Sequence, residues 1–413
     1  MRVGASLLIS LCIPMAGLAQ QVSEIKIEGL KRTKESYIRQ FILTQAGDQY
    51  DSLKTERDRQ RLANLEIMRG VTLEESRAHD SIILTFRFSE MINVIPIFAL
   101  GQTQETFWYR AGIQDANLGG RGGKIIAYYQ YYDRHSAFIS YTKPRIKSKP
   151  VGFSGTFIRW ATIEPLTINQ SVVEYEYHNL SSGASGIFYM GFRESVEVGF
   201  LGFKENYSRR NFTSEPSAPL SLSRQGGLIK TIFRSNHINV SSFYLRGFSS
   251  QLNFELIKRT ADASLFHIIF NEFKYFYRVG TRGNLATRLR LGLSTNEPSP
   301  FAPFVLDSYV NIRGVGNRVD RGTGSVVVNV EYRQTFFDKK LFAAQAVAFS
   351  DFGSWRKPGG TLADFTQSRN MKAFSGLGLR LIFKQAFDTM LRVDYGFDYN
   401  HKGGLVIGIG QYF

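Results

Sequence analysis

The sequence predicts a mainly β protein: a sixteen-stranded antiparallel transmembrane β-barrel over residues 92–413, preceded by one small α+β domain over residues 20–91. Three observations lead to this fold class. Aromatic residues make up 14% of the chain, yet no apolar run after residue 19 is long enough for a transmembrane helix. Segments that alternate with a period of two residues fill the region after residue 92. Long polar loops follow odd-numbered segments and short turns follow even-numbered ones, as in outer-membrane barrels.

Residues 1–19 have the pattern of a secretion signal peptide, because Arg2 precedes an apolar run that ends in Gly-Leu-Ala before Gln20. The alternative is an N-terminal helix that stays in the mature protein. Cys12, the only cysteine, lies within this segment. Export with cleavage therefore predicts a mature chain without disulfides or thiolate metal sites.

Residues 20–91 alternate first with the period of a strand and then with the period of helices. "VSEIKIEGL" predicts a strand, "TKESYIRQFIL" a helix capped by Thr33, and "SLKTERDRQRLANLEIM" a second helix. "GVTLEESRA" and "SIILTFRFSE" alternate again as two strands. This order, with the I-x-G of Ile27 and Gly29, resembles a POTRA domain. In related proteins POTRA domains offer strand edges to extended clients, so the resemblance implies an unfolded or extended client protein as a partner.

The barrel region is built from segments with one apolar and one polar face. In "SVVVNVEYRQTFF", Val328 and Val330 take one face while Asn329 and Glu331 take the other. "MLRVDYGFDYN", "GLGLRLIFK" and "ATRLRLGLS" repeat the pattern. An even number of such strands closes a barrel without a free edge, which a bilayer requires.

The net positive charge of the chain after residue 19 lies entirely in the barrel region. Residues 20–91 hold 12 basic and 12 acidic side chains, whereas residues 92–413 hold 38 Lys and Arg against 23 Asp and Glu. One interpretation is an anionic partner, such as outer-membrane lipid or lipopolysaccharide. The other is a solvated, basic barrel interior. Export makes nucleic acid an unsuitable partner.

A glycine-rich stretch, "WYRAGIQDANLGGRGGK", starts at Trp108. A phosphate-binding loop does not fit, because no Ser or Thr follows the lysine and no helix follows the turn. The stretch resembles the G-I-x-D-x-N-L-x-G-x-G segment of the BamA/TamA outer-membrane assembly superfamily, also called the bacterial surface antigen superfamily. Its matching residues here are Gly112, Ile113, Asp115, Asn117, Leu118, Gly120 and Gly122.

Two further motifs of that family occur at the expected strands. The R-G motif of the sixth outer loop is Arg313-Gly314, followed by Val315 where the family has an aromatic residue. The F-x-D-x-G motif ends in Asp351 and Gly353. The resemblance implies that the loop folds into the lumen, where Arg313 pairs with Asp351. We expect Arg313, Gly314, Asp351 and Gly353 to form this loop lock.

The first and last barrel strands are both weak, which marks their junction as a candidate lateral seam. Pro96 removes one N–H donor from "INVIPIFALG", and Gly408 and Gly410 weaken "GGLVIGIGQYF", which ends at Phe413. A lateral gate is one interpretation. The other is that the proline starts its strand and the glycines make room for the loop. The final aromatic residue resembles the assembly signal of outer-membrane proteins.

No catalytic pattern is present in the sequence. The six histidines are scattered, and neither H-E-x-x-H nor G-x-S-x-G occurs. We therefore expect no enzyme activity, cofactor or metal, with a Ser/His lipase on the barrel wall as the alternative.

The resemblance implies a protein of the bacterial outer membrane with its POTRA domain in the periplasm. The implied function is insertion or translocation of proteins, with possible accessory assembly proteins as partners. The rival function is a passive or lipid-conducting pore plugged by its own loop.

Overall fold

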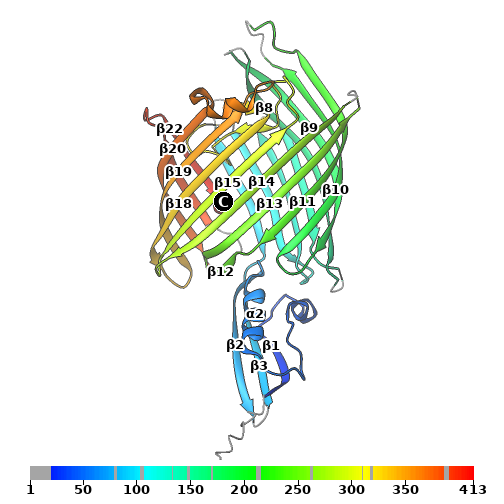
Figure 1. Ribbon diagram of the computed structural model, residues 1–413, viewed down its shortest axis with the longest axis vertical. Coiled ribbons are helices and arrows are strands. Elements are labelled where there is room, and N and C mark those ends of the chain that lie inside the picture. Colours follow the sequence, from blue (N-terminus) through cyan, green and yellow to red (C-terminus); the bar gives the residue numbers. More distant parts are fainter. Residues whose placement is uncertain are drawn as a thin grey trace, which may run out of the picture.

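The computed structural model describes residues 20–78, 81–102, 107–132, 134–146, 149–168, 171–210, 215–260, 264–308, 310–316, 320–385 and 390–413. The candidate signal peptide 1–19, with Cys12, lies outside these residues. A small N-terminal domain lies beneath one end of a large barrel (Figure 1).

The N-terminal domain has the predicted order of strand, helices and two strands. Its elements are β1 (Gln21–Glu28), α1 (Glu35–Ile38), η1 (Arg39–Phe41), α2 (Ser52–Ala63), β2 (Met68–Ala78) and β3 (Ser81–Glu90). The sheet order is β1-β3-β2, with β1 parallel and β2 antiparallel to the central β3. Asp51 caps helix α2, because its carboxylate accepts hydrogen bonds from the backbone N–H groups of Leu53 and Lys54.

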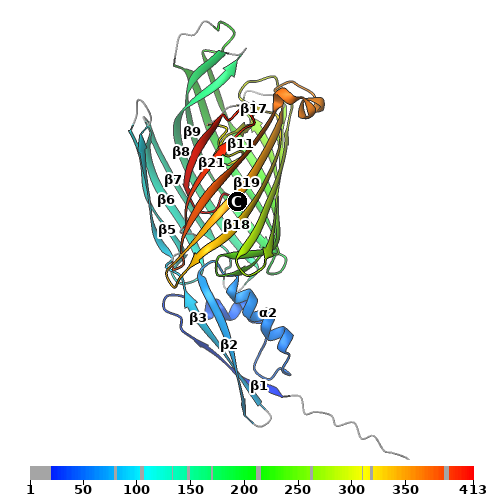
Figure 2. The ribbon, with the colours of Figure 1, turned by 90° about the vertical axis from the view of Figure 1, so that its left-hand side faces the viewer.

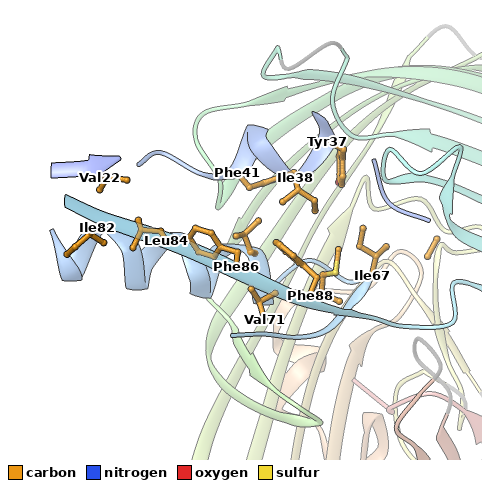
Figure 3. Packing of buried hydrophobic residues seen from close by; sticks show 13 residues of the cluster. Val22, Tyr37, Ile38, Phe41, Ile67, Val71, Ile82, Leu84, Phe86 and Phe88 are labelled. Atoms are coloured by element: carbon orange, nitrogen blue, oxygen red, sulfur yellow. The ribbon is translucent and has the colours of Figure 1, made fainter. Parts of the chain in front are cut away.

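The core of this domain lies between the sheet and the helices (Figure 3). Alternate residues of β3 point into it, and Ile82, Leu84 and Phe86 have no exposed surface. Ile38 and Leu62 meet them from α1 and α2 and are equally buried. Each such side chain contributes about 1.5–3 kcal/mol by leaving water. The apolar face of strand β3 and the apolar face of helix α2 therefore pack together in one small core.

One prediction for this domain is wrong. Thr33 does not cap the first helix, because α1 starts after Lys34 and has no side-chain cap. The Thr33 hydroxyl instead accepts a hydrogen bond from Asn117 of the barrel at 2.9 Å. A contact with the barrel has replaced a local cap.

Within the described residues, sixteen long antiparallel strands and one short strand form the closed barrel, and the sixteen long ones are those that the alternation predicts. They are β4 (Val94–Gln102), β5 (Phe107–Leu118), β6 (Gly123–Tyr132), β7 (His135–Lys143), β8 (Val151–Ile168), β9 (Ser171–Tyr189), β10 (Glu194–Arg209), β11 (Ser221–Asn236), β13 (Tyr244–Arg259), β14 (Leu265–Val279), β15 (Gly283–Ser294), β18 (Gly324–Asp338), β19 (Phe342–Arg356), β20 (Met371–Phe383), β21 (Met390–Phe397) and β22 (Gly403–Ile409). The short β12 (Asn239–Ser241) lies in the turn after β11. The barrel closes between β22 and β4.

The alternation of each strand separates an outer apolar face from an inner polar one. On β20, Leu377, Leu379 and Leu381 are 69%, 57% and 48% exposed, while Arg380 between them is 1% exposed. The register pairs Leu379 with Val393 of β21, so apolar side chains continue across neighbouring strands. The outer face is therefore a continuous apolar surface and the lumen is charged, as a membrane barrel requires.

Within the described residues, no helix has both the length and the apolar character needed to cross a membrane.

The barrel wall has unequal height. β8 and β9 have 18 and 19 residues, and this side rises above the rest of the barrel (Figure 2). β22 has only 7 residues and β4 has 9. The closing strands are thus among the shorter strands of the wall. Two 3-10 helices, η2 (Leu362–Thr366) and η3 (Ser368–Asn370), lie in the loop after β19.

Candidate functional site: the lumen loop and the seam

The long loop after β15 folds into the barrel lumen. It contains the short hairpin of β16 (Phe304–Leu306) and β17 (Asp320–Gly322), and its tip carries Ile312 and Arg313, both with 0% exposure. The neighbouring Val315 packs against a small apolar cluster that includes Ile312 and Trp355. The valine therefore still has an apolar contact where the family has an aromatic residue.

The structure brings Arg313 and Asp351 together. Arg313 donates from Nε to Asp351 Oδ2 at 2.8 Å and from Nη2 to Oδ1 at 2.9 Å. The backbone N–H of Arg313 donates to the same carboxylate at 3.0 Å. The planar guanidinium thus meets the carboxylate with two parallel hydrogen bonds, a geometry that lysine cannot form. Since Asp351 lies on β19, the pair fastens the loop to the barrel wall.

Arg313 is one member of a larger group of buried charges. Its Nη1 also donates to Glu331 on β18 at 2.6 Å and lies 3.8 Å from Asp394 on β21. Arg380 on β20 bonds Asp394 at 2.6 Å. We call Arg313, Arg333, Arg380, Glu331, Asp351 and Asp394 the lumen charge cluster, and each is at most 1% exposed.

The lumen charge cluster is balanced, with three guanidinium groups and three carboxylates. Burial of unpaired ions costs several kcal/mol each, so the cluster is stable only while its members stay together. It joins the loop to four consecutive strands, β18, β19, β20 and β21. Release of the loop would therefore leave charges of all four strands without a partner.

Glycines allow the loop tip to approach the wall. Gly314 has φ of +89°, and a Cβ there would lie 2.3 Å from the carbonyl oxygen of Gly396 on β21. A Cβ on Gly353 would lie 2.5 Å from a methyl carbon of Ile312. Both predicted glycines of the loop lock thus lie where a side chain would push the loop out of place.

The end of the chain does not follow the barrel wall as the sequence suggests. β22 ends at Ile409, and Gly410, with φ of +82°, turns the chain inward. In both ribbon views the C-terminal end lies within the outline of the barrel (Figures 1 and 2). Tyr412 and Phe413 are buried and pack against Phe276 of β14 on another part of the wall. Phe413 is therefore a lumen residue rather than a residue of the seam surface.

The other seam residues lie on the closing strands. Because Pro96 is the third residue of β4, it does not start the strand. Its side chain is exposed on the outer face. Gly408 lies in β22, where a Cβ would be 2.7 Å from Nε of Arg392. Gly404 of β22 lies beside the loop tip, with Gly314 O at 3.3 Å from an added Cβ. Gly404 and Gly408 of β22 therefore leave space for the loop tip and for the Arg392 side chain, which explains part of the glycine content of this strand.

Sequence reasoning missed Glu331, Asp394, Arg333 and Arg380. Their only signal is a charged residue on the polar face of each strand, which says that they point inward but not which of them meet. Among the described residues, no group of three His, Cys, Asp or Glu side chains could hold a metal ion.

Residues 20–91 match the POTRA family, described as the surface antigen variable number repeat. No curated protein is similar enough in sequence to count as a relative.

Several solved structures resemble most of the chain. A Haemophilus ducreyi BamA structure that lacks POTRA domains 1–3 has 16% identity and a TM-score of 0.57, and the match covers 94% of this chain and 83% of that one. CdiB from Escherichia coli has 10% identity and a TM-score of 0.61, with 94% and 75% covered. CdiB from Acinetobacter baumannii has 13% identity and a TM-score of 0.56, with 94% and 73% covered. The chain therefore carries a POTRA domain at residues 20–91, followed by a barrel with the fold of BamA and CdiB.

Proposed function

We propose that this protein inserts client polypeptides into the bacterial outer membrane, or translocates them across it, by opening the seam between β22 and β4. The barrel lies in the outer membrane and the POTRA domain in the periplasm. The observation that carries the proposal is the short seam strand β22, with 7 residues.

A strand needs about 9–11 residues to cross a bilayer. β22 falls below this length, and its chain leaves the wall at Gly410. On the other side of the seam, Pro96 has no N–H to donate. Fewer backbone hydrogen bonds can hold these two strands together than hold β8 and β9, which pair over 18 positions. The seam should therefore cost less to open than the long β8–β9 pair.

The POTRA sheet offers an edge on which a client strand can be added. One edge strand, β1, is partly covered, because Val22 N–H donates to Asp48 and Gly47 N–H donates to Val22. The other edge strand is β2, which pairs with β3 on its inner side. An extended client would bind β2 through main-chain hydrogen bonds. Only three residues, 91–93, separate β3 from the seam strand β4, so client capture and the seam are close along the chain.

The loop lock keeps the inserted loop inside the lumen during this process. Arg313 is bonded to Asp351 and Glu331, so the loop stays inside while β22 and β4 move. Outer-membrane lipid or lipopolysaccharide would contact the apolar outer face of the barrel in this proposal. Accessory assembly proteins are further partners in this proposal.

One observation favours the rival function of a passive or lipid-conducting pore. Between the inserted loop and β8–β14, the lumen holds a cavity of about 360 Å³, whose mixed lining includes the charged side chains of Glu205, Arg224 and Arg259. A solvated conduit through this side of the barrel would conduct without any client.

A disulfide across the seam tests the two functions. Cysteines at Phe98 of β4 and Ile407 of β22 should crosslink, stop client insertion, and allow it again after reduction. The matched control is a cysteine pair at Leu379 and Val393, which are register partners on β20 and β21. This control disulfide should leave insertion unchanged. Undiminished insertion by the seam-locked barrel would exclude the gate. Ion conductance without any client, together with no client insertion by the unlocked protein, would favour the passive pore.

A further inference from the structure

The glycine-rich turn between β5 and β6 lies against the POTRA domain. A break in the β5–β6 register between Asp115 and Leu118 turns residues 115–117 toward this domain. Ala116 becomes part of the hydrophobic core of the POTRA domain and is 5% exposed. A residue of a barrel strand therefore completes the core of a separate domain.

Polar contacts surround this shared core residue. Asp115, 5% exposed, forms an ion pair with Arg32 of the POTRA domain at 2.6 Å. Asn117, which is fully buried, donates from Nδ2 to the Thr33 hydroxyl at 2.9 Å. Its Oδ1 accepts from the Gly122 N–H at 2.8 Å, which shapes the turn. The backbone N–H of Lys34 donates to the Gly120 carbonyl at 2.8 Å.

The glycines of the turn fit closely against the POTRA domain. Gly120 has φ of +70°, and a Cβ there would lie 2.3 Å from the carbonyl oxygen of Arg32. Gly122 has φ of +66°, and a Cβ there would lie 2.2 Å from the Tyr37 hydroxyl. By contrast, Gly119 has the same φ of +70° but nothing within 4 Å of an added Cβ. The close fit is thus specific to the two glycines that face the POTRA domain.

Hydrogen bonds within the POTRA domain fix residues 31–33, the segment that contacts the turn. The Glu90 carboxylate accepts backbone N–H groups of Lys31, Arg32 and Thr33 at 3.0–3.1 Å. Burial raises the pKa of Glu90, but these hydrogen bonds lower it more, so its pKa lies below the ordinary value. An ionised Glu90 therefore fixes the segment that enters the turn.

Two other points of the barrel rim also touch the POTRA domain. Arg145, after β7, lies 5.7 Å from the ring of Phe41 and 5.2 Å from that of Phe192. On another side, Asn64 donates to Asn239 of β12 at 3.2 Å, and its Oδ1 accepts from the Val240 N–H at 3.2 Å. Phe192, after β9, also lies near the POTRA domain, with its ring 6.0 Å from that of Phe41. Contacts at the turns after β5, β7, β9 and β11 therefore restrict tilting of the domain in more than one direction.

We propose that the turn formed by Asp115, Asn117, Gly120 and Gly122 is a docking socket that holds the POTRA domain in one fixed pose beneath the barrel. This inference does not depend on the proposed function, because a pose can be measured without a client. For that function, a fixed pose would set the direction from which a client strand reaches the seam. A fixed POTRA domain keeps the β2 edge at a constant position relative to β4, so a bound client strand would always reach the seam in the same orientation.

The experiment reports the pose at a site remote from the socket. Asn64 and Asn239 are replaced by cysteine in a Cys12→Ser background, and the rate of disulfide formation is measured in the purified full-length protein without client. Gly120→Ala should slow this rate by about tenfold, the factor that corresponds to loss of one charge-assisted or buried hydrogen bond. Gly119→Ala is the matched control, with equal φ and no neighbour, and should keep the parent rate.

A second pair of variants, made in the same two-cysteine background, leaves the β5–β6 turn unchanged and tests the socket even if Gly120→Ala fails to fold. Arg32→Ala should also slow crosslinking. Its control is Lys54→Ala, since Lys54 forms an ion pair with Asp48 at the same 2.6 Å but within the POTRA domain. Heat-modifiable migration on gels confirms that each barrel is folded. Equal crosslinking rates for Arg32→Ala, Lys54→Ala and the parent would overturn the socket, and would leave the proposed function to be judged by its own seam test.

Discussion

The ring of Tyr412 lies 4.4 Å from the guanidinium carbon of Arg313, so the segment beyond the last strand contacts the buried arginine of the inserted loop. The Tyr412 hydroxyl also donates to the carbonyl of Ser308, in the same loop, at 3.1 Å. Arg288 and Arg392 lie 5.1 Å and 4.8 Å from this ring. A residue attached to the seam strand therefore braces the loop lock.

Tyr412→Ala should destabilise the barrel by about 3–5 kcal/mol, the range for removing a buried aromatic side chain. Tyr412→Phe keeps the ring over the three arginines and loses one hydrogen bond, so it should cost about 1 kcal/mol. Urea unfolding in lipid vesicles, followed by tryptophan fluorescence, measures both. If the two variants lose equal stability, the ring contacts with the arginines contribute nothing.

Arg313→Ala and Asp351→Ala should each cost about 3–5 kcal/mol, because each leaves the opposite charge buried without its partner. The double variant should cost less than the sum of the two. A double-mutant cycle in the same unfolding assay measures this coupling. Purely additive losses would mean that the bidentate contact has no energetic role.

A charge swap of Arg313 and Asp351 should restore only part of the function. The new carboxylate at position 313 would lie beside Glu331, which now bonds Arg313 at 2.6 Å. Arg313→Lys keeps the charge but loses the planar fork, so it is the matched control for geometry. Client insertion should fall in the order parent, Arg313→Lys, swap, Arg313→Ala. Full activity of the swap would show that Glu331 does not act on position 313.

The contribution of Glu90 should depend on pH. Its pKa is below the ordinary value of 4.5, so its stabilising effect is complete above that pH and is lost as pH falls through the lower, folded-state pKa. Hydrogen exchange at residues 31–33, corrected for the intrinsic effect of pH, should show protection that decreases below pH 4.5.

Glu90→Gln should lower this protection at neutral pH and remove its change at acidic pH. Glu56→Gln is the control, because Glu56 pairs with Arg59 on α2 and does not contact the loop. Identical exchange profiles for Glu90→Gln and the parent would mean that the carboxylate does not hold the loop.

Deletion of residues 22–89 should leave a folded, heat-modifiable barrel that no longer processes clients. The barrel strands pair with one another, and water can solvate the polar groups of the exposed socket. Gel migration tests folding, and accumulation of unfolded client in the periplasm tests function. Normal client processing by the shortened protein would remove the role of the β2 edge.

The sequence by itself determined the strand alternation, the sixteen-strand barrel and the parity of long and short loops. These features follow from local geometry, because a period of two places Val328 outward and Glu331 inward whatever lies nearby. The R-G motif and Asp351 were also visible in the sequence, although their pairing was an implication of family resemblance. Their contact required the loop to enter the lumen.

Tertiary structure alone decided which inward charges meet. Glu331, Arg380 and Asp394 lie on three different strands, and register and barrel closure bring them around Arg313. Thr33 and Ala116 show the same principle at the domain junction. Local signals assigned Thr33 to a helix cap, but it bonds Asn117 of the barrel, more than 80 positions away. They assigned Ala116 to a barrel strand, but it packs in the core of the POTRA domain. Such contacts depend on how barrel closure and domain packing position the strands in space. The alternation of apolar and polar residues along the sequence does not encode this.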